Sequence, residues 1–126
     1  MNKNYQLGLL YLVHLLVSAD GVIDENERAA LEKIKSRENI PDDIFLQFKK
    51  DITQKKERDI YQAGLESFSQ CSDQEKLRGF AILYKMSEVD GRVHVKEVRL
   101  LLYSSRMSGI EFDDVVKLAA EIPAFY

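Results

Sequence analysis

The feature that most constrains the fold is an internal repeat with a spacing of 70 residues. The repeated segment reads Asp-Gly-x-Ile/Val-x-x-x-Glu, and its two copies begin at Asp20 and Asp90. The same offset also aligns residues outside the segment, as the pairs Leu12 and Ile82, Val13 and Leu83, Leu31 and Leu101, and Ile40 and Ile110 show. Because so many matches fall in one register, the two halves of the chain are expected to share one structure.

Apolar residues recur with helical spacing along the chain, and no run of four or more residues alternates in the manner of a half-buried strand. The most apolar stretch, residues 7–17, resembles a signal peptide but is too short for a membrane span, which needs about 20 apolar residues. The repeat aligns this stretch with part of the second half, so we expect a core helix. The protein is then expected to be cytoplasmic and not to insert into the membrane.

Helix start and stop signals divide the chain into seven helices. Two capping boxes, Asp24 to Glu27 and Ser72 to Glu75, mark helix starts, and each Asp-Gly pair ends a helix. The predicted helices cover about residues 3–18, 24–37, 41–54, 57–70, 72–89, 94–107 and 112–122. We therefore predict one all-α domain over residues 1–126, a bundle whose pseudo-symmetric halves (3–54 and 72–122) are joined by a bridging helix (57–70).

Charge and cysteine content narrow the possible partners. The 18 basic and 21 acidic residues give a net charge of -3, so nucleic acid is not an expected partner. Cys71 is the one cysteine, which excludes an internal disulfide. His14 lies in the apolar stretch and is expected to be a core histidine. We expect a solvated face where basic residues gather, at Lys49, Lys50, Lys55, Lys56 and Arg58.

Acidic residues occur in two settings. The pairs Asp42-Asp43 and Asp113-Asp114 fall in the first turn of a predicted helix, where the macrodipole favours negative charge. The repeated segment instead matches the second half of an EF-hand loop, in which glycine makes a sharp turn and the final glutamate binds calcium. The first half of that loop is missing, because Leu16 and Met86 stand at its first position.

Weak binding of a divalent cation is therefore predicted, with at most three carboxylates in each half. Oxygen ligands favour calcium, magnesium or manganese, and His94 would let zinc compete at the second loop. Arg92 and Lys96 should weaken that second site by repulsion. The predicted metal ligands are Asp20, Asp24, Glu27, Asp90 and Glu97.

Two segments, LLVSADGVIDENERAAL (15–31) and YKMSEVDGRVHVKEVRLL (84–101), resemble the signature segments of TerB-like domains. This family includes the tellurite-resistance protein TerB and the N-terminal domain of the membrane-anchored DnaJ-like protein A. The resemblance covers nearly the whole chain and implies a helical bundle with acidic inter-helix loops. It also implies a role in tellurite and stress resistance, divalent metal binding, and a protein partner at the membrane. No enzymatic activity is attached to the family.

Three functions fit these observations. In the first, acidic loops bind a divalent ion and a nearby surface docks a protein partner. In the second, the domain is purely structural and residues such as Asp24 and Glu27 only cap helices. In the third, the carboxylates serve a metal-dependent enzyme, but the chain shows no recognisable nucleophile, phosphate loop or HExxH pattern. The sequence therefore favours a non-enzymatic interaction module.

Overall fold

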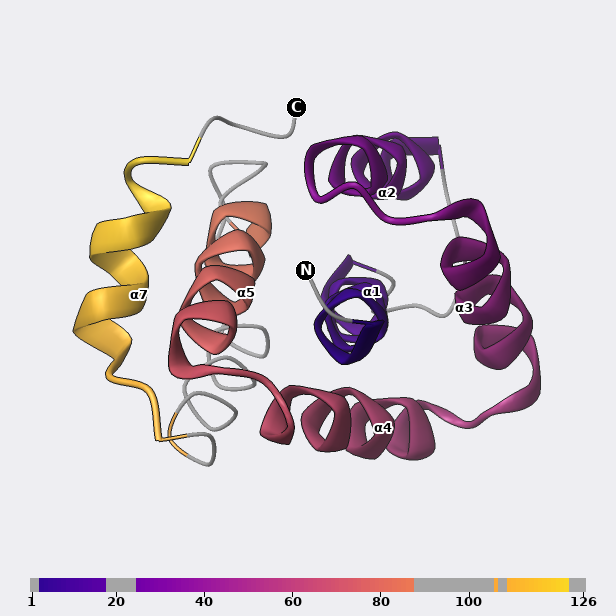
Figure 1. The fold of residues 1–126 in the computed structure, drawn as a ribbon. Coiled ribbons are helices and arrows are strands. Elements are labelled where there is room, and N and C mark those ends of the chain that lie inside the picture. The colour runs from indigo at the N-terminus through magenta and orange to yellow at the C-terminus, as the bar shows by residue number, and fades with distance from the viewer. Residues whose placement is uncertain (1–2, 18–24, 88–105, 107–108, 123–126) are drawn as a thin grey trace.

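One helix, α1 (Lys3–Val17), passes through the middle of the molecule, and four other helices surround it (Figure 1). The computed structural model describes residues 3–17, 25–87, 106 and 109–122. The surrounding helices all contact α1, whereas the last helix packs on α5. These five helices are α2 (Glu25–Arg37), α3 (Asp42–Gln54), α4 (Glu57–Ser69), α5 (Asp73–Ser87) and α7 (Phe112–Ala119).

The described part of the chain is all-helical and contains no strand, which confirms the predicted fold class. It contains six helices. The sixth predicted helix, over residues 94–107, lies outside the described residues except for Arg106, which is helical. Both ends of α5 lie 70 residues after the corresponding ends of α1. The first residue of α7 likewise lies 70 residues after the first residue of α3. Equivalent helices of the two halves therefore begin in the predicted register.

The central position of α1 follows from a sequence that is apolar on nearly every side. Residues 8–14 are all buried, and Leu9, Leu10 and Val13 have no exposed surface. His14 is buried as predicted, with its ring edge-on to Phe48 and 6.0 Å between ring centroids. The apolar stretch is thus a core helix, and no helix among the described residues is long and apolar enough to cross a membrane.

Glycines allow α1, α4 and α5 to pack closely. A Cβ atom added to Gly64 of α4 would lie 2.9 Å from the Leu12 side chain. Phe68 of α4 lies against glycines of both neighbours, because an added Cβ would be 2.6 Å from its ring at Gly8 and 2.5 Å from it at Gly79. The Phe68 ring is fully buried, in the space that the missing side chains of Gly8 and Gly79 leave.

Candidate binding groove

The predicted metal ligands lie outside what the structure describes. Asp20, Asp24, Asp90 and Glu97 are not among the described residues, and Glu27 is described only as a backbone position in α2. Within the described ranges, no group of three or more His, Cys, Asp or Glu side chains could hold a metal ion. The cation site in the two Asp-Gly loops therefore stays a prediction.

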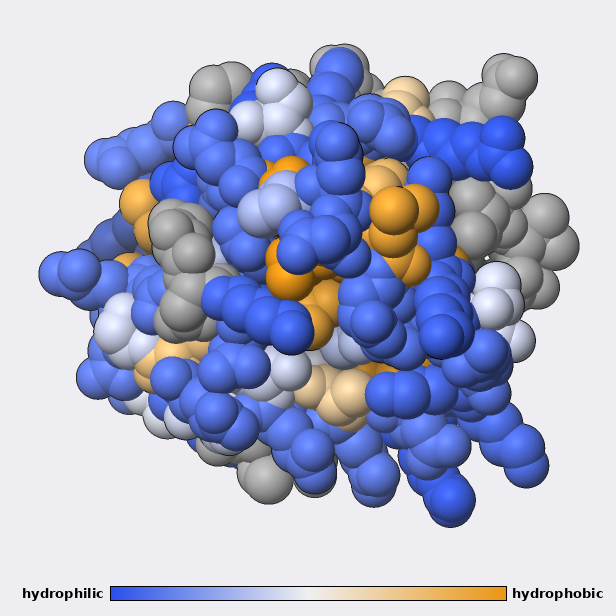
Figure 2. All heavy atoms as spheres, turned by 45° about the vertical axis from the view of Figure 1, so that its right-hand side comes forward, coloured by the Kyte–Doolittle hydropathy of each residue, from blue (hydrophilic) through white to orange (hydrophobic). Residues whose placement is uncertain are grey.

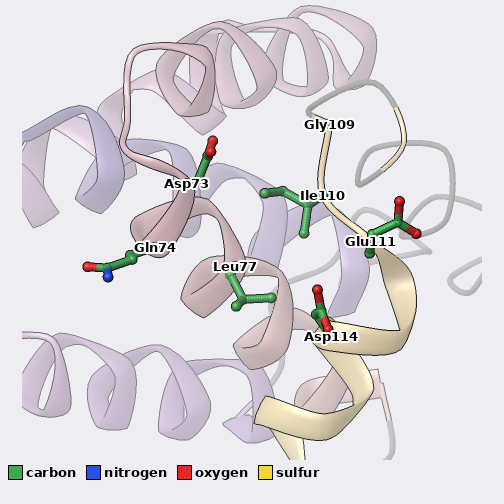
Figure 3. A pocket seen from close by; sticks show the side chains of 7 residues that line it. All are labelled: Asp73, Gln74, Leu77, Gly109, Ile110, Glu111 and Asp114. Atoms are coloured by element: carbon green, nitrogen blue, oxygen red, sulfur yellow. The ribbon is translucent and has the colours of Figure 1, made fainter.

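A groove of about 270 Å³ lies where the first turns of α5 and α7 meet (Figure 3). In the close-up, Leu77 and Ile110 lie between Asp73 on one side and Glu111 and Asp114 on the other. The lining consists of Asp73, Gln74, Leu77, Gly109, Ile110, Glu111 and Asp114, and we call it the acidic groove. Among the described residues, the lining combines apolar surface with three carboxylates and includes no basic side chain.

The α5 side of the groove is fixed by the capping box that the sequence predicts. The Ser72 hydroxyl accepts a hydrogen bond from the Glu75 backbone N–H at 3.2 Å, and Glu75 Oε1 accepts one from the Ser72 backbone N–H at 3.1 Å. These reciprocal bonds satisfy two of the backbone donors that a helix start leaves free. The box sets where α5 begins, and it thereby places Asp73 in the first turn, beside the groove.

The α7 side is fixed by a turn and an aromatic contact. Gly109 has a φ of 75°, a left-handed conformation that glycine adopts without strain, and its N–H donates to the Arg106 carbonyl at 3.1 Å. Glu111 occupies the N-cap position of α7 but makes no side-chain capping bond. Phe112 packs edge-on to Tyr84 of α5, with ring centroids 5.7 Å apart, and this contact holds the two helices together.

Electrostatics favour a cationic occupant for the acidic groove. Asp73 and Asp114 lie in first helical turns, as the macrodipole favours, and all three carboxylates belong to exposed residues. No ion pair to Asp73, Glu111 or Asp114 is present in the described part of the chain. An anion would be repelled, whereas a cation with an aliphatic stem could contact both the carboxylates and the apolar surface.

An ion pair between a half-exposed arginine and a buried glutamate joins α5 to the end of α2. Arg78 of α5 donates from Nε to Glu38 Oε1 at 2.7 Å and from Nη2 to Oε2 at 2.8 Å, a bidentate arrangement. Tyr5 of α1 donates its hydroxyl to the same carboxylate. The Glu38 side chain is 2% exposed and that of Arg78 is 40% exposed. Three helices are therefore tied together at one carboxylate.

Glu38 points inward because of the way α2 ends. Asn39 has a φ of 54°, and the backbone N–H groups of Ile40 and Asn39 donate to the carbonyls of Lys35 and Ser36 at 2.9 and 3.4 Å. This is a Schellman motif, with asparagine in the left-handed position. The Asn39 carbonyl in turn accepts a hydrogen bond from the Gln6 side chain at 3.3 Å. The motif thus docks the end of α2 on α1.

The pKa values in this cluster reflect a balance between burial and pairing. Burial alone would raise the pKa of Glu38, but hydrogen bonds from Arg78 and Tyr5 and the positive charge of Arg78 outweigh it, so the pKa lies below its usual value. Burial, followed by the hydrogen bond to Glu38, raises the pKa of Tyr5. Glu38 is therefore an anion in the folded protein at neutral pH, and Tyr5 is a neutral donor.

A second polar contact ties α1 to α3. The Tyr11 hydroxyl donates to Asp51 Oδ2, and Gln47 Nε2 donates to Asp51 Oδ1 at 3.0 Å. Burial, and then the hydrogen bond to Asp51, raise the pKa of Tyr11. The two tyrosines of α1, whose rings are buried, therefore each donate a hydrogen bond to a carboxylate outside α1. Both hydrogen bonds help to hold α1 in place.

The sequence alone predicted neither the Glu38–Arg78 ion pair nor the acidic groove. Glu38 and Arg78 are 40 residues apart, and nothing local to either residue indicates a pairing. For the groove, the assignment of Asp114 to the first turn of a helix is confirmed, but its position opposite Asp73 depends on how α5 and α7 pack. The one usable signal was the capping box, which fixes the start of α5.

The described fold is an all-helical bundle around a central helix, with an acidic groove between two helix starts. No family model, curated protein or solved structure matches this chain.

Proposed function

We propose that this domain is a non-enzymatic protein-binding module whose acidic groove holds a lysine or arginine side chain of its partner. The observation that carries the proposal is the position of three carboxylates, which form no ion pair in the part of the chain that the structure describes, around the apolar surface of Leu77 and Ile110. The aliphatic stem of a basic residue would cover the apolar surface while its charged head meets the carboxylates. The resemblance to TerB-like domains supports a non-enzymatic role beside a membrane partner in the cytoplasm.

The expected affinity is low. Exposed ion pairs contribute only about 0–1 kcal/mol each, and the groove accommodates little more than one side chain. Burial of the aliphatic stem adds about 0.8 kcal/mol for each methylene group that is covered. A total of about 4–5 kcal/mol from both terms corresponds to a dissociation constant on the order of 10⁻⁴–10⁻³ M. Binding should weaken as salt is added, because the charges are exposed to solvent.

A titration with lysine-rich peptides, followed by NMR chemical shifts, tests this function. We expect saturable shifts at the groove, and at least a tenfold loss of affinity when the groove carboxylates are neutralised by Asp73→Asn, Glu111→Gln and Asp114→Asn. A peptide with norleucine in place of lysine should not bind. Asp59→Asn with Glu66→Gln is the matched control, because these exposed acids lie on another helix, α4, and do not line the groove.

The proposal is wrong if the lysine peptide produces no saturable shift, or if it binds the neutralised variant as tightly as the wild type. The control variant separates a specific loss from a general change in surface charge, since it removes two negative charges from α4, which does not line the groove. Circular dichroism on each variant checks that α5 and α7 remain folded after their first-turn acids are removed.

The predicted cation site has its own experiment. We expect calorimetry with calcium, magnesium or manganese to show weak binding, with a dissociation constant on the order of 10⁻⁴–10⁻³ M. Asp20→Asn with Glu27→Gln should abolish the stronger phase, and Asp90→Asn with Glu97→Gln should affect only the weaker one. If the wild type gives no saturable response to millimolar metal, these residues serve as caps and turns.

A further inference from the structure

The segment of residues 49–58, at the end of α3 and the start of α4, holds five basic residues against two acidic ones, Asp51 and Glu57, and we call it the basic segment. Its five cationic residues are all exposed, which confirms the predicted solvated face: Lys49, Lys50, Lys55, Lys56 and Arg58. Lys49 lies over the Phe45 ring at 4.7 Å and Lys55 over the Tyr11 ring at 5.8 Å. Within the described part of the chain, Lys50, Lys56 and Arg58 form no ion pair.

The basic segment and the acidic groove lie on opposite sides of α1. In Figure 1, the turn from α3 to α4 is on the right of the central helix, whereas α5 and α7 are on the left. Figure 2 brings the right-hand side forward and shows a face that is mostly hydrophilic, with apolar side chains among the polar ones. Leu46 of α3, which is 64% exposed, precedes Lys49 and Lys50 by one helical turn.

We propose that the partner of the acidic groove is the basic segment of a second copy of this chain. This inference rests on the proposed function and names its partner. Both complementary surfaces are present on one molecule, and within the described residues the groove carboxylates and the basic side chains of the segment form no ion pair. Because the two surfaces are far apart on each copy, their contact is heterologous, and it leaves one free groove and one free basic segment at the ends of a dimer.

Head-to-tail association of this kind continues beyond two copies, as a ring or an open chain. Each junction would place a side chain such as Lys56 on Leu77 and Ile110, with its ammonium group near the carboxylates. Lys55 and Lys56 lie at the turn between α3 and α4, and both residues are exposed. Since the charges are exposed, salt should dissociate the assembly.

Sedimentation velocity with a charge-swap pair tests the proposal. One variant, Glu111→Lys with Asp114→Lys, makes the groove basic. The other, Lys55→Glu with Lys56→Glu, makes the basic segment acidic. At low salt the wild type should sediment faster as its concentration rises, and neither variant should do so alone. An equimolar mixture of the two should associate, because the unchanged segment of one matches the unchanged groove of the other.

The matched control is Arg28→Glu with Lys33→Glu, which reverses two exposed charges on α2, outside both the acidic groove and the basic segment, and should associate like the wild type. Circular dichroism confirms that each variant is folded. The proposal is overturned if the wild type and the mixture stay monomeric at every concentration, or if each variant alone associates like the wild type. Lysine-peptide binding by a chain that stays monomeric would overturn this inference while leaving the proposed function intact.

Discussion

Replacing Arg78 by methionine is expected to destabilise the fold by about 3 kcal/mol at neutral pH, because it leaves the Glu38 carboxylate buried without its counter-charge. This value is at the lower end of the range for broken buried pairs, since the Arg78 side chain is 40% exposed and water can reach the site. Urea unfolding followed by circular dichroism measures the change. Methionine keeps much of the apolar stem, so the loss reports the charge.

The pH dependence of this variant should be opposite in sign to that of the wild type. In the wild type the folded-state pKa of Glu38 lies below its unfolded value, so the pair stabilises the fold above about pH 4 and less so as pH falls through the folded pKa. Without Arg78, burial dominates and raises that pKa. Relative to the wild type, the folded state of the variant is then least stable at neutral pH. It recovers stability as the pH falls and Glu38 takes up a proton.

Glu38→Gln with Arg78→Met is the matched control, because a neutral amide can still accept the Tyr5 hydrogen bond. We expect it to be more stable than Arg78→Met alone at neutral pH and to lack the recovery of stability on acidification that protonation of Glu38 gives to Arg78→Met. If Arg78→Met lowers the free energy of unfolding by the same amount at pH 4 and at pH 7, Glu38 is not a buried anion.

The largest packing effect is expected at Phe68. Phe68→Ala should cost about 3–5 kcal/mol of the free energy of unfolding, since the ring is fully buried between α1 and α5. Gly79→Ala should destabilise by about 1–3 kcal/mol despite the better helix propensity of alanine, because its Cβ would lie 2.5 Å from the Phe68 ring. Thermal and urea unfolding measure both losses.

Measuring Gly79→Ala in a background with a smaller residue at position 68 tests whether contact with the Phe68 ring is the cause. Leucine at position 68 lacks the outer ring atoms that an added Cβ at Gly79 would meet. Gly79→Ala should therefore be destabilising in the wild type but stabilising in a Phe68→Leu background, where it fills space and favours the helix. The same sign of effect in both backgrounds would show that contact with Phe68 is not what excludes a side chain at position 79.

Much of the fold could be predicted from local sequence, because the signals for helices are local. The apolar stretch predicted a core helix at α1, and the box from Ser72 to Glu75 predicted the start of α5. The end of α7 was placed three residues too late. After Ala119 the chain continues as a turn in which Glu121 and Ile122 bond to carbonyls three residues back, so the apolar Ile122 did not mark a helical position.

The sites were less predictable, because they depend on packing between distant elements. The acidic groove requires the start of α5 to face the start of α7, and the Glu38–Arg78 pair requires the last turn of α2 to reach α5. Sequence spacing carries no information about either contact. The residues chosen from the repeat, such as Asp20 and Asp90, lie outside the described chain and await the calorimetry described above.

The central position of α1 also has a consequence for the order of folding. Its most extensive contacts are with α4 and α5, which follow it by about 50–70 residues in the chain. During synthesis α1 is therefore made well before the helices that cover it, and its apolar residues 8–14 remain accessible to water or to chaperones until α5 has been made. Closing such long loops should slow folding relative to helical bundles whose neighbours in sequence are neighbours in space.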